Sequence, residues 1–213
     1  MRTLAAIILL LCCCTAFAAE QAVFLQTKSG QTFRGSYIEV ASAPRAVIVL
    51  ADPPRQALAE ALKQELPRHG YAVLHADTTA AEKVNAIDQV RAAVDFLQAK
   101  GHPLIAIAAY DRAAVLANDY LIGVPDNGVA AWACISVSGG ELRDAAKFHA
   151  PTLDIYGAND TREILDKAGA RAAIIRKMRG SAQIELAGAD HYYANAEQAL
   201  ATMIRQFLDE RVK

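Results

Sequence analysis

The feature that most constrains the fold is the alternation, after Pro44, of short apolar runs with segments of helical periodicity. The run at 46–50 reads Ala-Val-Ile-Val-Leu, whereas Leu58, Leu62 and Leu66 recur at helical spacing. A strand that is apolar on both faces has to be covered by helices on both faces, which is typical of a parallel sheet. The alternation therefore predicts a βαβ series.

The same pattern continues to the end of the chain. The expected strands after Pro44 lie at 46–50, 71–74, 104–110, 130–135, 152–156 and 183–186. The expected helices lie at 58–66, 84–97, 112–121, 163–179 and 200–208. Ahead of them, strands at 23–26 and 32–40 around the turn Lys28-Ser29-Gly30 predict an antiparallel hairpin. No polar linker interrupts the series, so we expect a single α/β domain at 19–213.

Residues 1–18 predict a secretory signal peptide. Arg2 is a positive n-region, 4–14 is an apolar stretch, and Ala16-Phe17-Ala18 has the small-x-small form of a cleavage site. The apolar stretch is shorter than the ~20 residues that span a bilayer, which disfavours a transmembrane anchor. A lipoprotein signal is the other alternative, but no small residue precedes the cysteines at 12–14. We expect a periplasmic or secreted protein with no transmembrane span in the mature chain.

Cysteine content and charge follow from this processing. Three of the four cysteines leave with residues 1–18, so Cys134 alone remains, and its apolar surroundings at 130–135 predict a buried core residue. Losing Arg2 leaves 21 of the 22 basic residues against 23 acidic ones, a net charge of −2. Such a balance creates no field that would attract nucleic acid, so we expect no nucleic-acid partner.

Ligands of an open α/β sheet bind beyond the carboxyl ends of its strands. The polar residues expected at those ends are Asp52, Asp77, Asp111, Ser138, Asp160 and His191. Around Asp111 the segment 109–113 has a small-x-Asp-x-small form, which is the pattern of a nucleophile elbow. The central residue of such a tight turn is held in strained backbone, which aspartate tolerates better than most residues.

From here the order of elements resembles the α/β-hydrolase fold over nearly all of the mature chain. In that fold a nucleophile follows the fifth strand, an acid the seventh and a histidine the eighth. The segment 151–160, Pro-Thr-Leu-Asp-Ile-Tyr-Gly-Ala-Asn-Asp, looks like the acid-bearing strand and loop, and 188–193 looks like the histidine loop. The resemblance implies a minimal, capless and mostly parallel α/β-hydrolase-like sheet with Asp111, Asp160 and His191 at the triad positions.

The C-terminal third, with its Leu-Asp-Ile-Tyr strand and arginine-rich helix, is also similar to a bacterial family of small secreted hydrolase-like proteins with no assigned function.

Two departures from the hydrolase pattern bear on activity. The loop 51–55, Ala-Asp-Pro-Pro-Arg, lacks the His-Gly pair that helps to build an oxyanion hole, and proline has no N–H to donate. Asp111 cannot replace an alkoxide at an ester carbonyl, because its attack gives an anhydride that reverts. Ser138, beside Gly139-Gly140, is the other candidate nucleophile, although a loop serine is its ordinary interpretation.

Aspartate nucleophiles occur on this fold in haloalkane dehalogenases and epoxide hydrolases, where the carboxylate attacks an sp³ carbon. Those enzymes usually enclose the substrate beneath a cap after the sixth strand. Only residues 139–150 separate Ser138 from Pro151, too few for a cap domain. Trp132, the only tryptophan, lies inside a predicted strand, where it is badly placed to hold a leaving halide.

Each candidate residue also has a purely structural interpretation. Asp111 would be the N-cap of the following helix, and Asp160 with Glu163 would form a capping box. His191 would be a loop histidine packed by Tyr192 and its neighbour. The remaining histidines show no paired ligand spacing, so we expect no metal and no cofactor. These histidines are His69, His75, His102 and His149.

The expected helix at 163–179 is basic, and a solvated face is its first interpretation, with an acidic partner or a membrane surface as the alternative. Its basic residues are Lys167, Arg171, Arg176, Lys177 and Arg179. For function, the favoured hypothesis is a hydrolase-like protein without serine-hydrolase activity, retained to bind a small molecule or an envelope protein. The alternative is a small-substrate hydrolase that uses Asp111 or Ser138, with His191 as base and Asp160 as the acid that orients it.

Overall fold

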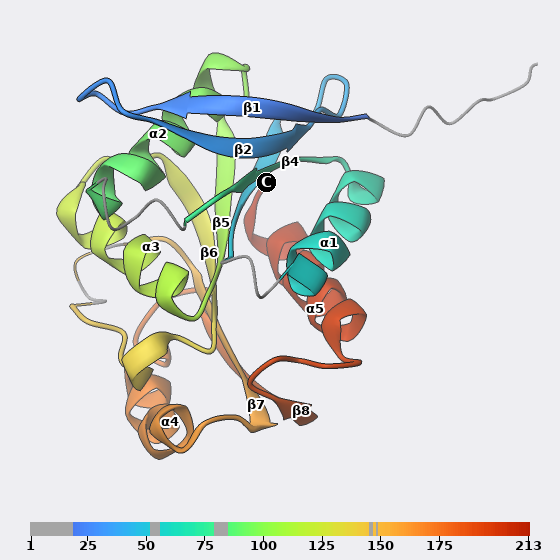
Figure 1. Cartoon of the computed structure of the whole chain (residues 1–213). Coiled ribbons are helices and arrows are strands. Elements are labelled where there is room, and N and C mark those ends of the chain that lie inside the picture. The colour runs from blue at the N-terminus through green and yellow to red at the C-terminus, as the bar shows by residue number, and fades with distance from the viewer. Residues whose placement is uncertain (1–18, 52–55, 79–84, 145–146, 148) are drawn as a thin grey trace, which may run out of the picture.

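The computed structural model describes residues 19–51, 56–78, 85–144, 147 and 149–213, which form one eight-stranded sheet with helices on both faces (Figure 1). The strands are β1 (Glu20–Gln26), β2 (Thr32–Ile38), β3 (Arg45–Leu50), β4 (Tyr71–Ala76), β5 (Leu104–Tyr110), β6 (Val129–Ile135), β7 (Thr152–Asn159) and β8 (Ala182–Asp190). The helices are α1 (Gln56–Glu65), α2 (Ala86–Ala99), α3 (Arg112–Gly123), α4 (Arg162–Ile175) and α5 (Glu197–Arg211), with short 3₁₀ turns η2 (Leu66–His69) and η4 (Ser138–Gly140).

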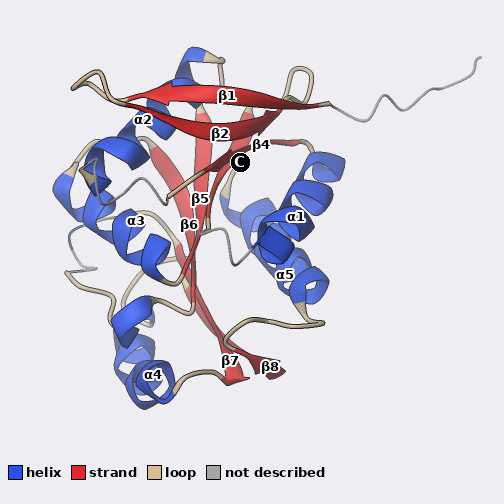
Figure 2. Cartoon of the chain, viewed as in Figure 1, coloured by secondary structure: helices blue, strands red, loops and turns tan. Residues whose placement is uncertain are grey.

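The sheet has the order β1-β2-β4-β3-β5-β6-β7-β8. Strand β2 is antiparallel to both β1 and β4, and the six strands from β4 to β8 run parallel. Helices α1 and α5 lie on one side of the parallel strands, and α2, α3 and α4 lie on the other (Figure 2). The predicted fold class, a mostly parallel sheet with an N-terminal antiparallel hairpin, is confirmed.

The interior follows from the apolar strands. Every side chain of the 46–50 run is at most 2% exposed, with Val47 and Val49 facing one layer of helices and Ile48 facing the other. Leu58 and Leu62 of α1 belong to the same buried cluster as Val47. The strands are therefore buried on both faces, as their continuous apolar sequence predicts.

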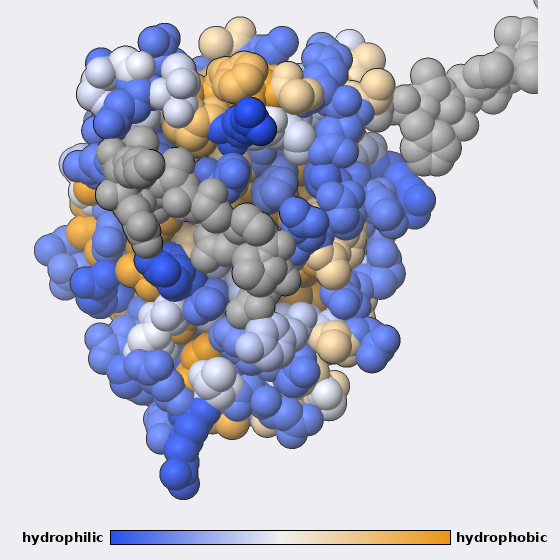
Figure 3. Space-filling view, in the orientation of Figure 1, coloured by the Kyte–Doolittle hydropathy of each residue, from blue (hydrophilic) through white to orange (hydrophobic). Residues whose placement is uncertain are grey.

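The β1–β2 hairpin extends the sheet beyond β4. Gly30 turns the chain with a φ of +83°, a conformation that glycine adopts without strain. Gly35 of β2 lies so close to β4 that a Cβ there would be 2.8 Å from the carbonyl oxygen of His75. Apolar surface gathers over this hairpin in Figure 3. Phe24 of β1 is 71% exposed.

The basic helix differs from its prediction. It was expected at 163–179, but α4 ends at Ile175, and the segment that follows is a turn. Arg171 does not belong to a solvated face, because it is 1% exposed and its Nε lies 2.8 Å from Oδ2 of Asp154 in β7. The same guanidinium donates through Nη1 to the carbonyl oxygens of Gly140 and Ile164. Its charge therefore ties α4 to the sheet and to η4.

Two core predictions hold. Cys134 is a free, fully buried thiol in β6, and burial raises its pKa well above the ordinary value. Trp132 of the same strand is also fully buried.

Within the residues that the structure describes, no helix is long and apolar enough to cross a membrane. The signal peptide at 1–18 and the loop at 52–55 lie outside the described residues, so both remain predictions.

Candidate active site

Asp111 occupies the sharp turn between β5 and α3. Its backbone has φ +54° and ψ −118°, a strained conformation for a residue with a side chain, and its N–H donates to the Ile135 carbonyl at 2.9 Å. Asp111 is the N-cap residue of α3 by position, as predicted, but its carboxylate makes no capping hydrogen bond to the first turn of that helix. The strand–turn–helix geometry is that of a nucleophile elbow, with a carboxylate at its centre.

His191 follows β8 and places its imidazole between two carboxylates. Its Nδ1 lies 2.7 Å from Oδ1 of Asp160, and its Nε2 lies 3.8 Å from Oδ2 of Asp111. The exposed fraction of the side chain is 23% for Asp111, 14% for His191 and 0% for Asp160. The structure therefore brings the three triad positions together at the carboxyl edge of the sheet, while their catalytic roles remain predictions.

The Asp160 carboxylate is stabilised as an anion by four hydrogen-bond donors. Besides His191, its carboxylate accepts the Thr161 N–H at 2.7 Å, the Gly157 N–H at 3.3 Å and the Ser136 hydroxyl. Burial alone would raise its pKa, but the hydrogen bonds from His191, Ser136 and the backbone lower the pKa below its usual value. Helix α4 takes Thr161 as its N-cap, so the capping box expected from Asp160 is wrong.

The two carboxylates make His191 a strong base. Asp111 first and Asp160 second raise the pKa of the imidazole to about 9, against the opposing effect of partial burial. At neutral pH the ring is therefore an imidazolium, with a proton on each nitrogen. An imidazolium can donate a hydrogen bond to a ligand, but it cannot accept a proton from a nucleophile.

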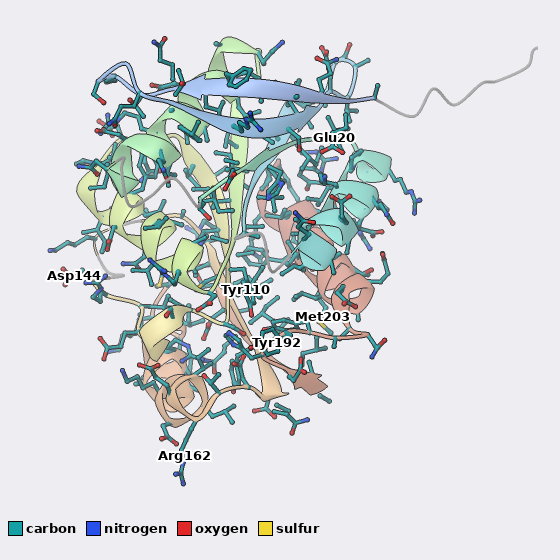
Figure 4. All side chains as sticks on the ribbon, in the orientation of Figure 1. Glu20, Tyr110, Asp144, Arg162, Tyr192 and Met203 are labelled. Atoms are coloured by element: carbon teal, nitrogen blue, oxygen red, sulfur yellow. The ribbon has the colours of Figure 1, made fainter. Side chains whose placement is uncertain are left out.

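Three tyrosines surround this cluster. Tyr110, the last residue of β5, donates its hydroxyl proton to the His191 carbonyl at 2.5 Å, and its ring lies 5.5 Å from the imidazole. Tyr192 packs edge-on against the imidazole at 5.4 Å and is 60% exposed. Figure 4 shows Tyr110 and Tyr192 near each other where β5 and the β8 loop meet. The third, Tyr193, is fully buried, with its ring 6.2 Å from that of Tyr110.

The structure adds Ser136, a residue that the sequence did not single out. It follows β6, is fully buried with a φ of +44°, and contacts Asp160 and Tyr193 through its hydroxyl. Ser138, the predicted alternative nucleophile, begins η4, and its backbone N–H donates to the Asp111 carbonyl at 3.2 Å. The sequence signal that could have found Ser136 is its position directly after the apolar strand β6.

The other residues expected at strand ends are Asp77 and Asp52. The N–H of Asp77 donates to the Arg34 carbonyl at 3.1 Å, which places Asp77 beside the hairpin, and Asp52 lies outside the described residues. His102 bridges the Tyr37 hydroxyl and the Ala43 carbonyl. Across the described parts of the chain, no group of three or more His, Cys, Asp or Glu side chains could hold a metal ion.

Solved structures that resemble this chain include esterases and other hydrolases. An esterase domain from Rhodothermus marinus has a TM-score of 0.73 at 15% identity, covering 92% of this chain and 100% of its own. A dienelactone hydrolase from Anabaena variabilis has a TM-score of 0.72 at 16% identity, covering 92% and 100%. A serine hydrolase without a lid from Xanthomonas campestris has a TM-score of 0.70 at 14% identity, covering 90% and 94%.

In sequence, no protein-family model matches the chain, and no curated protein matches it. The structural likeness establishes the α/β-hydrolase fold in its lidless form. At these identities it does not extend to an activity.

Proposed function

We propose that this chain is a secreted or periplasmic α/β-hydrolase-fold protein that lacks serine-hydrolase activity and binds a small polar ligand at Asp111 and His191. The proposal rests chiefly on one observation, the carboxylate of Asp111 at the centre of the elbow, 3.8 Å from Nε2 of His191. A serine hydrolase needs a hydroxyl there and a neutral imidazole to deprotonate it. Here the elbow carries an anion, and that anion helps to keep the imidazole protonated.

The chemistry of the ligand follows from what the site exposes. Asp111 is the most exposed of the three side chains, and a carboxylate accepts hydrogen bonds without donating any. With both aspartates ionised and His191 protonated, the cluster carries a net negative charge. A hydroxyl or ammonium group of a ligand would donate a hydrogen bond to the exposed part of Asp111, whereas a carboxylate ligand would be repelled. We therefore propose ligands that carry a hydroxyl or an amine.

Two reagents test the absence of serine-hydrolase activity. A fluorophosphonate should not label the mature protein, and short-chain nitrophenyl esters should hydrolyse no faster than with a His191→Ala variant. A known lidless serine hydrolase serves as the positive control for both. Labelling that maps to Ser138 would overturn the proposal and make the protein a serine hydrolase with a displaced nucleophile.

The ligand class is tested by NMR on the ring resonances of His191. Ethanolamine and ethylene glycol should shift these resonances, and acetate at the same concentration and ionic strength should not. The shifts with ethanolamine should be lost in Asp111→Asn, which keeps the size of the side chain and removes its charge. Stronger shifts with acetate, or no response to either donor, would contradict the proposed ligand class.

A second candidate is a hydrolase that uses Asp111 as its nucleophile, favoured by the elbow geometry of that residue. Its carboxylate oxygen would bond to an sp³ carbon while the carbon–halogen bond breaks and the halide departs with the electron pair. Esterification neutralises Asp111, one of the two carboxylates that raise the pKa of His191. The imidazole then loses that support for its proton and can deprotonate the water that hydrolyses the ester.

Mass spectrometry separates the two candidates. With a short haloalkane, a His191→Gln variant of such a hydrolase would accumulate an alkyl ester on Asp111, because the water would lack its base. A mass increase on the peptide that contains Asp111 establishes the hydrolase. An unmodified peptide after prolonged incubation, in the wild type and in His191→Gln, supports the binding protein.

A further inference from the structure

Behind the ion pairs lies a second, fully buried group of side chains. The hydroxyl of Ser136 bonds to Oδ2 of Asp160 and lies 2.7 Å from the hydroxyl of Tyr193, and both Ser136 and Tyr193 are 0% exposed. Ser136 follows β6, Asp160 follows β7 and Tyr193 follows β8, so the group joins three neighbouring strand ends. Nothing in a ligand-binding role for Asp111 and His191 by itself requires these two hydroxyls.

The direction of these hydrogen bonds is fixed by chemistry. The ionised Asp160 can only accept, so the Ser136 proton points to the carboxylate. The Ser136 oxygen must then accept from Tyr193, whose pKa is raised by burial so that its hydroxyl keeps its proton. The Tyr193 hydroxyl also faces the Ile155 carbonyl at 3.4 Å. Tyr193 therefore donates to Ser136, and Ser136 donates to Asp160. His191 donates to the same carboxylate from the other side.

The backbone at these positions is strained. Ser136 has a φ of +44° and Tyr193 a φ of +54°, and Asp111 shares this left-handed region at +54°. Non-glycine residues in such conformations are energetically costly, and they cluster at functional sites. Here the strain brings two hydroxyls together beneath a carboxylate.

The carboxylate has one oxygen for each side of the cluster. Oδ1 faces His191 at 2.7 Å and the Thr161 N–H, while Oδ2 depends on Ser136 and on a longer contact of 3.3 Å with the Gly157 N–H. Without the Ser136 hydroxyl, Oδ2 would keep only that longer contact. The bonds of Oδ1 to His191 and to the Thr161 N–H would then be the main restraint on rotation of the carboxylate. The bond that holds the imidazole therefore depends on a hydroxyl that does not touch it.

We infer that Ser136 and Tyr193 are positioning residues, which hold the Asp160 carboxylate in the orientation from which its Oδ1 accepts the Nδ1 proton of His191. The inference deepens the proposed function and rests on it for the role of His191 as a protonated ligand-binding group. It adds two hydroxyls that set the direction and protonation of the imidazole from the side opposite to Asp111.

The experiment is an NMR titration of His191 in the full mature chain without ligand. The chain has five histidines, and the resonances of His191 are identified by their loss in His191→Gln. Two signals are followed, the pKa from the ring resonances and the downfield resonance of the Nδ1 proton that is bonded to Asp160. Because no ligand is present, failure of this inference is distinguishable from failure of the ligand-binding proposal.

Two replacements of Ser136 distinguish the effect of its hydroxyl group from the effect of its strained backbone. Ser136→Ala removes the hydroxyl and keeps the strained backbone, while Ser136→Gly removes both, so the glycine variant should fold even where alanine is unstable. In both we expect the pKa of His191 to fall by about one unit or more and the Nδ1 resonance to weaken or disappear. Tyr193→Phe should change both signals in the same direction by a smaller amount, because Ser136 then keeps its bond to Asp160 but loses the donor that orients it.

Tyr120→Phe is the matched control. Tyr120 is 2% exposed and donates its hydroxyl to the Asn127 carbonyl at 2.9 Å, so the variant loses one buried tyrosine hydrogen bond elsewhere in the fold. Its His191 signals should match those of the wild type even if its melting temperature falls. Unchanged signals in both Ser136 variants would overturn the inference. A rise of the His191 pKa would also overturn it, since Ser136 would then only moderate the charge of Asp160.

Discussion

The replacement Asp111→Asn probes the charge of the elbow residue with little change of shape. Asparagine is isosteric with aspartate and also tolerates the φ of +54° found here. His191 has a pKa of about 9 in the folded chain and an ordinary value of 6.5. At about 1.4 kcal/mol for each pH unit of difference, the protonated ring stabilises the fold by roughly 3 kcal/mol below pH 6.5.

Asp111 is one of the two carboxylates that raise this pKa, so its neutralisation should remove about half of that free energy, ~1.5 kcal/mol. For a domain of this size, such a loss lowers the melting temperature by about 3–6 °C. Stabilisation by a raised histidine pKa is complete below the unfolded pKa and disappears as the pH rises through the folded value. The deficit of the variant should therefore be full near pH 6 and should shrink toward zero between about pH 6.5 and 9.

The lower end of the window is set by Asp160. Its lowered pKa stabilises the fold above its ordinary value of 3.8, and this contribution is lost as the pH falls through the depressed folded value. Thermal unfolding followed by circular dichroism at about pH 6, 8 and 10 stays above that region.

Asp144→Asn is the matched control. Asp144 also has a positive φ, of +48°, and its ion pair with Lys147 is largely exposed. Its loss should cost about 0.5 kcal/mol or less, with no histidine-like dependence on pH. Figure 4 shows Asp144 far from Tyr110 and Tyr192. An equal deficit for Asp111→Asn at every pH would refute the reasoning, because the carboxylate would then stabilise the turn and not the imidazolium.

Three further predictions concern processing and packing. N-terminal analysis of protein from the periplasmic fraction should begin at or near Ala19, and a chain that retains residues 1–18 or carries a lipid would contradict the predicted signal. Arg171→Met should lower the free energy of unfolding in urea by about 3–5 kcal/mol, because it leaves Asp154 buried and without its cation. A change below about 1 kcal/mol would contradict a stabilising role for this ion pair. Gly157→Ala should lower the melting temperature, because its Cβ would lie 2.4 Å from a carbonyl oxygen of β8. Gly169→Ala has open space in α4 and should raise the melting temperature, because alanine stabilises a helix by about 1 kcal/mol relative to glycine. A higher melting temperature for Gly157→Ala than for Gly169→Ala would contradict the packing described.

Sequence reasoning worked best where burial is complete. The run at 46–50 could only be an interior strand, and β3 spans Arg45–Leu50. The prediction that Arg171 lies on a solvated face was wrong, because the sequence does not show that Arg171 pairs with the buried Asp154 of β7. A buried ion pair between distant segments leaves no mark in helical periodicity. The end of α4 at Ile175 was missed for a similar reason, since basic residues are compatible with both a helix and a turn.

For the candidate site, the order of Asp111, Asp160 and His191 was sufficient to expect their approach at one sheet edge. The capping box expected from Asp160 was wrong because capping preferences depend on where a helix begins, and α4 begins one residue later than a cap at Asp160 requires. Ser136 was missed because serine has no particular preference for its left-handed backbone. Its importance lies in contacts with residues that are distant in the sequence.

The order of the strands also has a consequence for how the chain folds. Ser136 and Asp160 are 24 residues apart and Asp160 and His191 are 31 apart, and each belongs to the end of a different parallel strand. No local turn can bring such groups together, because parallel neighbours need a crossover connection before they pair. Contacts of this kind are formed late and slowly in folding. Since β8 forms an edge of the sheet, we expect a refolding chain to acquire the His191 imidazolium only when that edge strand docks.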